Sequence, residues 1–215
     1  MKRNIIILMA LLFSAPIIII GVVQNDDDSI LQHLPESIQP VAVNPPVPLQ
    51  DFTLTSHKLK SVNKSDFTGK WSFVFFGYTN CPDICPATLS QLVLVNKLLQ
   101  QKYQDVSPPQ FYLVSVDNPR DTTEKLAAYI EYFNKDFVAL RGNDSQLAIF
   151  EDIFGVFHRA EKADLRGNYA VAHSSETFLV NPDGEIVAKF SPPMDIPQIA
   201  QLYSQIVSYF DQPLS

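Results

Sequence analysis

Residues 71–86 read WSFVFFGYTNCPDICP, and this stretch decides the fold because a buried strand, a tight connection and a helix start follow one another directly. The apolar run Trp71–Gly77 is typical of a strand that is buried on both faces. Apolar residues at helical spacing predict a helix over Pro86–Lys102, and proline is tolerated in a first helical turn. Cys81 and Cys85 therefore lie at the junction between the strongest strand and the strongest helix.

Further strands and helices alternate along the chain, and the turn sequence Asn181-Pro-Asp-Gly predicts a hairpin near the end. Strands are predicted over Phe52–Thr55, Phe111–Val116, Phe137–Leu140, Thr177–Val180 and Glu185–Phe190, and helices over Asp121–Asn134, Asp144–Phe154 (with Asn143 or Asp144 as its cap) and Ile196–Phe210. Residues 159–169, between the predicted helix Asp144–Phe154 and the predicted strand Thr177–Val180, are a polar segment that we call the polar excursion. This order predicts an α/β protein with the thioredoxin arrangement, a mixed central sheet flanked by helices.

Composition sets the broad class of the protein. The chain has 215 residues, of which 46% are hydrophobic and 18% are charged, a balance that suits one soluble domain with an appendage. The net charge of −7 and the lack of a basic stripe argue against nucleic acid as a partner. Two cysteines cannot build a disulfide scaffold, and a disulfide between residues four apart closes too small a loop to stabilise much. A purely structural crosslink is therefore the weaker interpretation of the pair.

The N-terminus predicts a membrane anchor. Basic residues at positions 2 and 3 precede Ile5–Val23, which is uncharged and close to the roughly 20 residues that span a bilayer. We expect residues 1–24 to be an uncleaved transmembrane anchor, with a cleaved signal peptide as the alternative. Residues 25–49, rich in proline and aspartate, are predicted to be a tether, and residues 50–215 the folded domain. Either alternative exports the domain, which would face the periplasm or an equivalent space from the inner membrane.

The cysteine pair predicts a metal-binding or redox-active site. A helix N-terminus favours thiolate, and two cysteines four residues apart can direct their sulfurs to one point. Of the four histidines, His173 is the best third ligand, because the segment that enters the strand Thr177–Val180 faces the start of the cysteine helix in a sheet of this order. Two thiolates and one imidazole without a fourth protein ligand suit low-coordinate copper better than structural zinc.

From about Gln50 onward the chain resembles the Sco/SenC family of membrane-anchored copper-binding proteins. Three blocks carry the resemblance: residues 76–86 (FGYTNCPDICP), residues 114–122 (VSVDNPRDT) and residues 173–184 (HSSETFLVNPDG). The resemblance implies a thioredoxin-like fold, with copper ligands at Cys81, Cys85 and His173. Members of the family help to build the binuclear copper centre of cytochrome c oxidase, as metallochaperone, thiol reductase or both.

The sequence departs from the family pattern at two positions. Asn80 stands where the family often has histidine, and this change leaves the three ligands intact. Ala172 stands where the family often has aspartate. The absence of the aspartate removes a carboxylate that could orient the neighbouring ligand or a partner surface, so copper affinity or the partner contact is open to change.

Several polar residues near the motifs have two interpretations. Asp117 and Arg120 either form a partner-recognition rim near the site or make a surface ion pair of small energetic value. Asp83 could tune the thiols, but an aspartate at a helix start more often only complements the helix dipole. Met194 is a weaker candidate for a soft ligand than for packing. The other histidines, His33, His57 and His158, are interpreted as solvated or locally hydrogen-bonded.

The leading functional hypothesis is a copper metallochaperone that holds Cu(I), or alternatively Cu(II), through Cys81, Cys85 and His173. It would pass the metal to the copper-bearing subunit of cytochrome c oxidase or to another copper carrier. The alternative is a thiol–disulfide oxidoreductase that keeps the cysteines of the oxidase copper site reduced, in which Cys81 and Cys85 are catalytic and form a disulfide when oxidised. A peroxiredoxin-like peroxidase is a third and weaker hypothesis.

Overall fold

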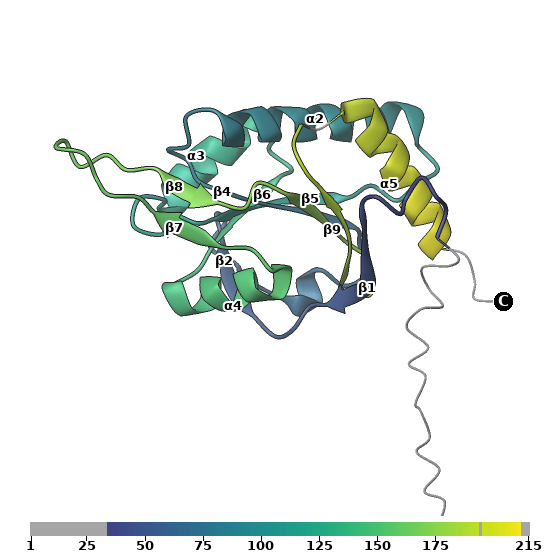
Figure 1. Ribbon diagram of the computed structural model, residues 1–215, viewed down its shortest axis with the longest axis horizontal. Helices are drawn as coiled ribbons and strands as arrows, with labels where there is room; N and C mark the ends of the chain where they lie inside the picture. Colours follow the sequence, from purple (N-terminus) through teal and green to yellow (C-terminus); the bar gives the residue numbers. More distant parts are fainter. Residues whose placement is uncertain (1–33, 194, 212–215) are drawn as a thin grey trace, which may run out of the picture.

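The computed structural model describes residues 34–193 and 195–211 and is built around one eight-stranded sheet with helices on both faces (Figure 1). Helix α2 lies along one face, accompanied by α3 and α5, and α4 lies on the opposite face. The predicted anchor, residues 1–24, lies outside the described residues. None of the helices within residues 34–193 and 195–211 is both long and apolar enough to cross a bilayer.

The sheet is mixed, as the sequence predicts, and its strands run in the order β1-β10-β9-β4-β5-β6-β2-β3. These strands are β1 (Ala42–Pro48), β2 (Thr53–Ser56), β3 (Ser61–Asn63), β4 (Ser72–Gly77), β5 (Gln110–Ser115), β6 (Val138–Arg141), β9 (Thr177–Val180) and β10 (Glu185–Phe190). The helices are the 3₁₀ turn η1 (Lys64–Asp66), α2 (Ile84–Lys102), α3 (Thr123–Phe133), α4 (Asp144–Phe154) and α5 (Ile196–Phe210).

Strands β4, β5 and β6 are parallel and form the centre of the sheet. Every residue of β4 is buried, which confirms the interpretation of its apolar run. β4 and β5 pair in register from Ser72↔Gln110 to Gly77↔Ser115, so both strands end at the same edge. The segments that follow them, residues 78–83 and 116–122, therefore start side by side. The carboxyl edge of parallel strands is where α/β proteins commonly place their sites.

The folded part of the chain begins before the predicted boundary at residue 50. Strand β1 pairs with β10, and Ile38 and Leu49 are 2% and 1% exposed, so residues 34–49 belong to the folded unit and not to a tether. The prolines of this segment misled the prediction, since proline is tolerated in an edge strand, where fewer ladder hydrogen bonds are needed. Residues 25–33 of the predicted tether lie outside the described residues.

A second difference concerns the polar excursion at residues 159–169. The structure places it in a hairpin whose strands β7 (His158–Ala160) and β8 (Val171–His173) form a separate two-stranded sheet. The hairpin projects away from the main sheet (Figure 1). His173 therefore lies at the end of a strand and not in an irregular loop. Three-residue strands in a polar segment lack the alternation from which strands are predicted.

His57 is buried, and its titration makes the free energy of unfolding depend on pH. Its Nδ1 accepts a hydrogen bond from the Ala139 N–H at 3.0 Å, and burial lowers the pKa of its imidazole. The folded state binds the His57 proton less readily than the unfolded chain does. The contribution of neutral His57 to the free energy of unfolding is therefore present above the usual pKa of about 6.5 and is lost as the pH falls below it.

We therefore expect the substitution His57→Asn, which keeps an acceptor near the Nδ1 position but cannot titrate, to flatten the fall in stability between pH 7.5 and pH 5. Urea unfolding of the two proteins at a series of pH values measures this. Equal losses of stability in both proteins would contradict the assignment of this pH dependence to His57.

Candidate metal centre

The two cysteines lie at the start of helix α2, on the segment that leaves β4. The helix begins at Ile84, two residues earlier than predicted, so Cys85 is in its first turn and Cys81 precedes it. The backbone N–H of Cys85 donates a hydrogen bond to Cys81 Sγ at 3.3 Å. A helix N-terminal N–H group directed at the sulfur is the interaction that favours negative charge on it. Both residues are unlinked thiols in this structure.

The two sulfurs differ in burial. Cys81 is partly exposed, whereas Cys85 is 0% exposed, and burial raises the pKa of the Cys85 thiol far above its ordinary value. The prediction that the helix start favours thiolate is therefore wrong for Cys85 in the metal-free protein, because desolvation outweighs the helix dipole. A metal that binds Cys85 must displace its proton, so binding is coupled to proton release.

His173 lies beside the sulfurs, as predicted. Its Nδ1 lies 2.7 Å from the carbonyl oxygen of Ser174, and since a carbonyl can only accept, Nδ1 carries the proton. Its Nε2 lies 3.7 Å from Cys85 Sγ. Burial lowers the pKa of His173, which keeps its imidazole neutral at neutral pH. A neutral ring with Nε2 unprotonated is the form that binds metals.

The ligand atoms of Cys81, Cys85 and His173 all lie within 4.8 Å of one another. Within residues 34–193 and 195–211 this is the one group of three or more histidine, cysteine or acidic side chains arranged closely enough to hold a metal ion. Two sulfurs and one imidazole nitrogen fit a soft, low-coordinate ion such as Cu(I), and they are too few protein ligands for a structural zinc site.

The other histidines do not join this group. His57 is buried next to β6, and His158 Nδ1 lies 2.6 Å from Glu151 Oε1 on α4. Both are locally hydrogen-bonded, as predicted, although His57 is not solvated. His33 and Met194 lie outside the described residues.

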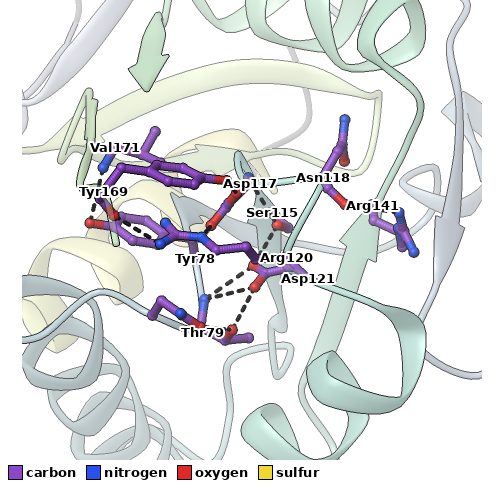
Figure 2. Close-up of polar contacts among 11 residues, drawn as sticks. Tyr78, Thr79, Ser115, Asp117, Asn118, Arg120, Asp121, Arg141, Tyr169 and Val171 are labelled. Carbon is purple, nitrogen blue, oxygen red and sulfur yellow. Dashed lines mark hydrogen bonds and ion pairs between the residues drawn. The ribbon is translucent and has the colours of Figure 1, made fainter. Parts of the chain in front are cut away.

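A buried polar network around Asp121 binds Thr79, which lies two residues before Cys81 (Figure 2). Asp121 is 0% exposed and accepts hydrogen bonds from the Thr79 backbone N–H at 3.1 Å and from the Ser115 hydroxyl at 2.6 Å. The Thr79 hydroxyl donates to the same carboxylate. Asp121 thus ties the segment that carries Cys81 to the end of β5.

Of the two residues predicted as a partner rim, Asp117 is buried and Arg120 is partly exposed. Asp117 is 2% exposed, and its carboxylate pairs with the Arg120 guanidinium and accepts a hydrogen bond from the Tyr169 hydroxyl at 2.8 Å. A buried carboxylate with both oxygens engaged offers little to a partner, so the structure corrects the rim prediction for Asp117. The pair is not a fully exposed ion pair either, because its carboxylate is buried, although the Arg120 side chain is partly exposed.

The two departures from the family pattern, and Asp83, lie at the margin of the site. Asn80 is exposed, and its side-chain oxygen lies 3.2 Å from the Thr79 hydroxyl oxygen, whose proton is donated to Asp121. Ala172 pairs with Arg159 across the hairpin, next to His173. Asp83 is exposed, and its side chain makes no capping hydrogen bond to α2.

Sequence reasoning missed four residues that shape the site: Gly77, Tyr78, Asp121 and Tyr169. Tyr78 packs edge-on to the His173 ring with 5.8 Å between centroids, and its hydroxyl accepts from the Val171 N–H. Asp121 and Tyr78 lie in the blocks that carry the family resemblance, which was the available signal. Tyr169 lies in the polar excursion, where no pattern singles it out.

An α/β sheet of this order, with two thiols and an imidazole at its carboxyl edge, defines a thioredoxin-like protein with a thiol-rich metal-binding site. The family model described as SCO1/SenC matches residues 44–208, well over half of the chain. The chain belongs to the SCO1/SenC family.

Individual relatives agree with this assignment. The mitochondrial SCO2 homolog of Homo sapiens is 33% identical over 165 residues, which cover 77% of this chain and 62% of the human protein. The structure of Bradyrhizobium japonicum ScoI with copper bound is 27% identical with a TM-score of 0.65, and the match covers 74% of this chain and 99% of that one. Yeast Sco1 with copper bound is 25% identical with a TM-score of 0.70, over 79% of this chain and 91% of the yeast one. These matches confirm the thioredoxin-like fold.

Gly77 leaves room for the buried sulfur, and this gives a direct test of the packing. A Cβ atom at Gly77 would lie 3.1 Å from Cys85 Sγ and 2.9 Å from a ring carbon of Phe75. We expect Gly77→Ala to cost about 1–3 kcal/mol of stability by overpacking and to displace the Cys85 thiol. Urea unfolding and the rate at which iodoacetamide alkylates Cys85 measure the two effects, and alkylation should be faster in the variant.

The control for this substitution is Ser72→Ala at the opposite end of β4. The Ser72 hydroxyl is buried without a hydrogen-bond partner among the described residues, so its removal should cost little. A Gly77→Ala protein with the parent's stability and the parent's alkylation rate would show that Gly77 does not limit the space around Cys85.

Proposed function

We propose that this protein is a copper metallochaperone in which Cys81, Cys85 and His173 hold Cu(I) as cargo. The observation that carries the proposal is the convergence of two sulfurs and a neutral imidazole within 4.8 Å, a donor set suited to copper. The structural relatives with copper bound support the choice of metal. The partially exposed Cys81 would meet the incoming ion first, and buried Cys85 would follow with loss of its proton.

The proposed recipient is the copper-bearing subunit of cytochrome c oxidase, or another copper carrier that serves it. Membership of the SCO1/SenC family supports this choice. The proposed location follows from the N-terminal segment, residues 1–24, as an anchor in the inner membrane with the site facing the periplasm or an equivalent space. Transfer to a partner is favoured by a site with three protein ligands, since a fourth ligand from the recipient can enter without displacing one first.

A second candidate function is thiol–disulfide exchange, for which two unlinked thiols, one of them partly exposed, are the required starting state. Cys81 would attack a partner disulfide, and Cys85 would then resolve the mixed disulfide. In the balanced reaction the two thiols of this protein become one disulfide, and two electrons and two protons reduce the partner disulfide to two thiols. This route gives His173 no part as a ligand, so that residue separates the two functions.

We expect His173→Ala to lower Cu(I) affinity by at least about 100-fold, because loss of a ligand costs more than the about 10–100-fold that follows loss of a residue that only orients a ligand, while disulfide-reductase turnover stays negligible in both proteins. Competition with a Cu(I)-specific chromophoric chelator measures the affinity, and reduction of a model disulfide measures turnover. The matched control is His158→Gln, which changes the histidine directly across the hairpin from His173. The control should retain the parent's Cu(I) affinity.

Two results would decide against the metallochaperone. Unchanged Cu(I) affinity in His173→Ala together with substantial reductase turnover would favour the oxidoreductase. A fall of equal size in His158→Gln would show that the loss reflects damage to the hairpin and not a missing ligand.

A further inference from the structure

The hairpin that carries His173 follows α4 and leads into β9 after a few residues at each end, and beyond these chain connections side chains hold it against the body of the protein. Strands β7 and β8 form a sheet of their own and share no ladder with the eight-stranded sheet in the described part of the chain. The cysteines, by contrast, lie directly after a central strand and at the start of a long helix. The distance between the imidazole and the sulfurs therefore depends on what holds the hairpin against the carboxyl edge of β4 and β5.

Arg120 makes the most extensive of these attachments (Figure 2). Its guanidinium lies 3.6 Å from the centroid of the Tyr169 ring, a stacked cation–π contact, and its Nη1 donates to the Tyr169 carbonyl oxygen at 2.8 Å. The same guanidinium pairs with Asp117, which also accepts the Tyr169 hydroxyl. Tyr169 is thus held at its ring, its hydroxyl and its backbone by two residues from the segment that follows β5.

The Arg120 side chain also contacts the segment that leads to Cys81, and that segment is bonded to the strand that carries His173. The Arg120 guanidinium also lies 5.7 Å from the centroid of the Tyr78 ring, and the Tyr78 hydroxyl accepts a hydrogen bond from the Val171 N–H at 3.2 Å. Val171 is two residues before His173, and Tyr78 is three residues before Cys81. One guanidinium between two tyrosine rings therefore joins the segment that carries the imidazole to the segment that carries the first sulfur.

The opposite strand of the hairpin has a separate attachment. His158, which pairs with His173 across the hairpin, is bound to Glu151 on α4. This contact involves neither Arg120 nor the cysteine segment. Loss of the Arg120 contacts would therefore leave the hairpin attached through His158 and through the Val171–Tyr78 hydrogen bond, with the His173 strand held by fewer contacts.

We propose that Arg120 and Tyr169, with Asp117, form a latch that positions His173 over the cysteine pair. These residues do not contact the copper. They set the fraction of time for which His173 is in position as the third ligand, and this fraction in turn sets the Cu(I) affinity. Opening of the latch would leave the metal on two sulfurs, the state from which a recipient can take it. This inference rests on the proposed copper function.

Two substitutions weaken the latch without removing a ligand. Arg120→Lys keeps the positive charge beside Asp117 but loses the planar stack and the fork that reaches the Tyr169 carbonyl. Tyr169→Phe keeps the stack and removes only the hydroxyl bonded to Asp117. The matched control is Arg141→Lys, because Arg141 on β6 donates to the Asn118 carbonyl at 3.3 Å, beside the network but away from the hairpin.

The experiment measures the full chain with and without copper. In the metal-free protein, ¹H–¹⁵N heteronuclear NOEs should fall for residues 158–173 in Arg120→Lys, and less in Tyr169→Phe, while the rest of the domain keeps the parent's values. Cu(I) affinity should fall by about tenfold in Arg120→Lys. In the His173→Ala background the same Arg120→Lys change should have no further effect on affinity, because the latch acts only through that ligand.

Each other outcome overturns the proposal or a defined part of it. A hairpin as ordered in Arg120→Lys and Tyr169→Phe as in the Arg141→Lys control would refute the latch, and so would a mobile hairpin with undiminished copper affinity. An Arg120→Lys effect that persists in full without His173 would assign Arg120 a general structural role instead. If Arg120→Lys fails to fold, Tyr169→Phe decides alone. Unchanged affinity in His173→Ala itself would refute the three-ligand site, a failure of the proposed function and not of the latch.

Discussion

The parallel pairing of β4 with β5 is the constraint on which the rest of the site depends. Because the two strands are paired in register up to Gly77 and Ser115, the segments that leave them start side by side at one edge of the sheet. One segment carries Cys81 and leads to Cys85, and the other carries Asp117 and Asp121. The second segment then holds the first through Asp121 and holds the histidine hairpin through Asp117 and Arg120. A pair of buried strands thereby fixes where the segment that carries the sulfurs begins and where the segment that contacts the histidine hairpin begins.

The three proposed ligands, Cys81, Cys85 and His173, differ in burial and in hydrogen-bond partners. The sulfur of Cys85 is sealed between α2 and the end of β4, where desolvation keeps it protonated until a metal replaces the proton. The sulfur of Cys81 is partly exposed and receives the helix N–H. The His173 ring is held neutral by burial and oriented by the Ser174 carbonyl. The site therefore combines an accessible first ligand with a buried second one and a third that depends on a separately attached hairpin.

Much of the fold could be predicted from the sequence, because the patterns that indicate its strands, helices and turns are local or periodic. The apolar run before the cysteines, the helical spacing after them and the Asn-Pro-Asp-Gly turn are enough to predict the thioredoxin order. The residues before 50 were missed because Pro-rich edge strands resemble linkers, and the β7–β8 hairpin was missed because its strands are short and polar. Contacts such as Arg120 on Tyr169, between residues 49 positions apart, could not be predicted, since nothing in either segment specifies the other.

The central claim is that the cargo is bound by both sulfurs and by the imidazole at the same time. X-ray absorption spectroscopy at the copper edge of the Cu(I)-loaded full chain tests it most directly, because sulfur and imidazole nitrogen neighbours scatter differently. We expect two sulfur neighbours and one nitrogen neighbour with the outer-shell scattering of an imidazole ring, and loss of the nitrogen shell alone in His173→Ala. A spectrum of the parent protein with sulfur neighbours only, unchanged by that substitution, would contradict it.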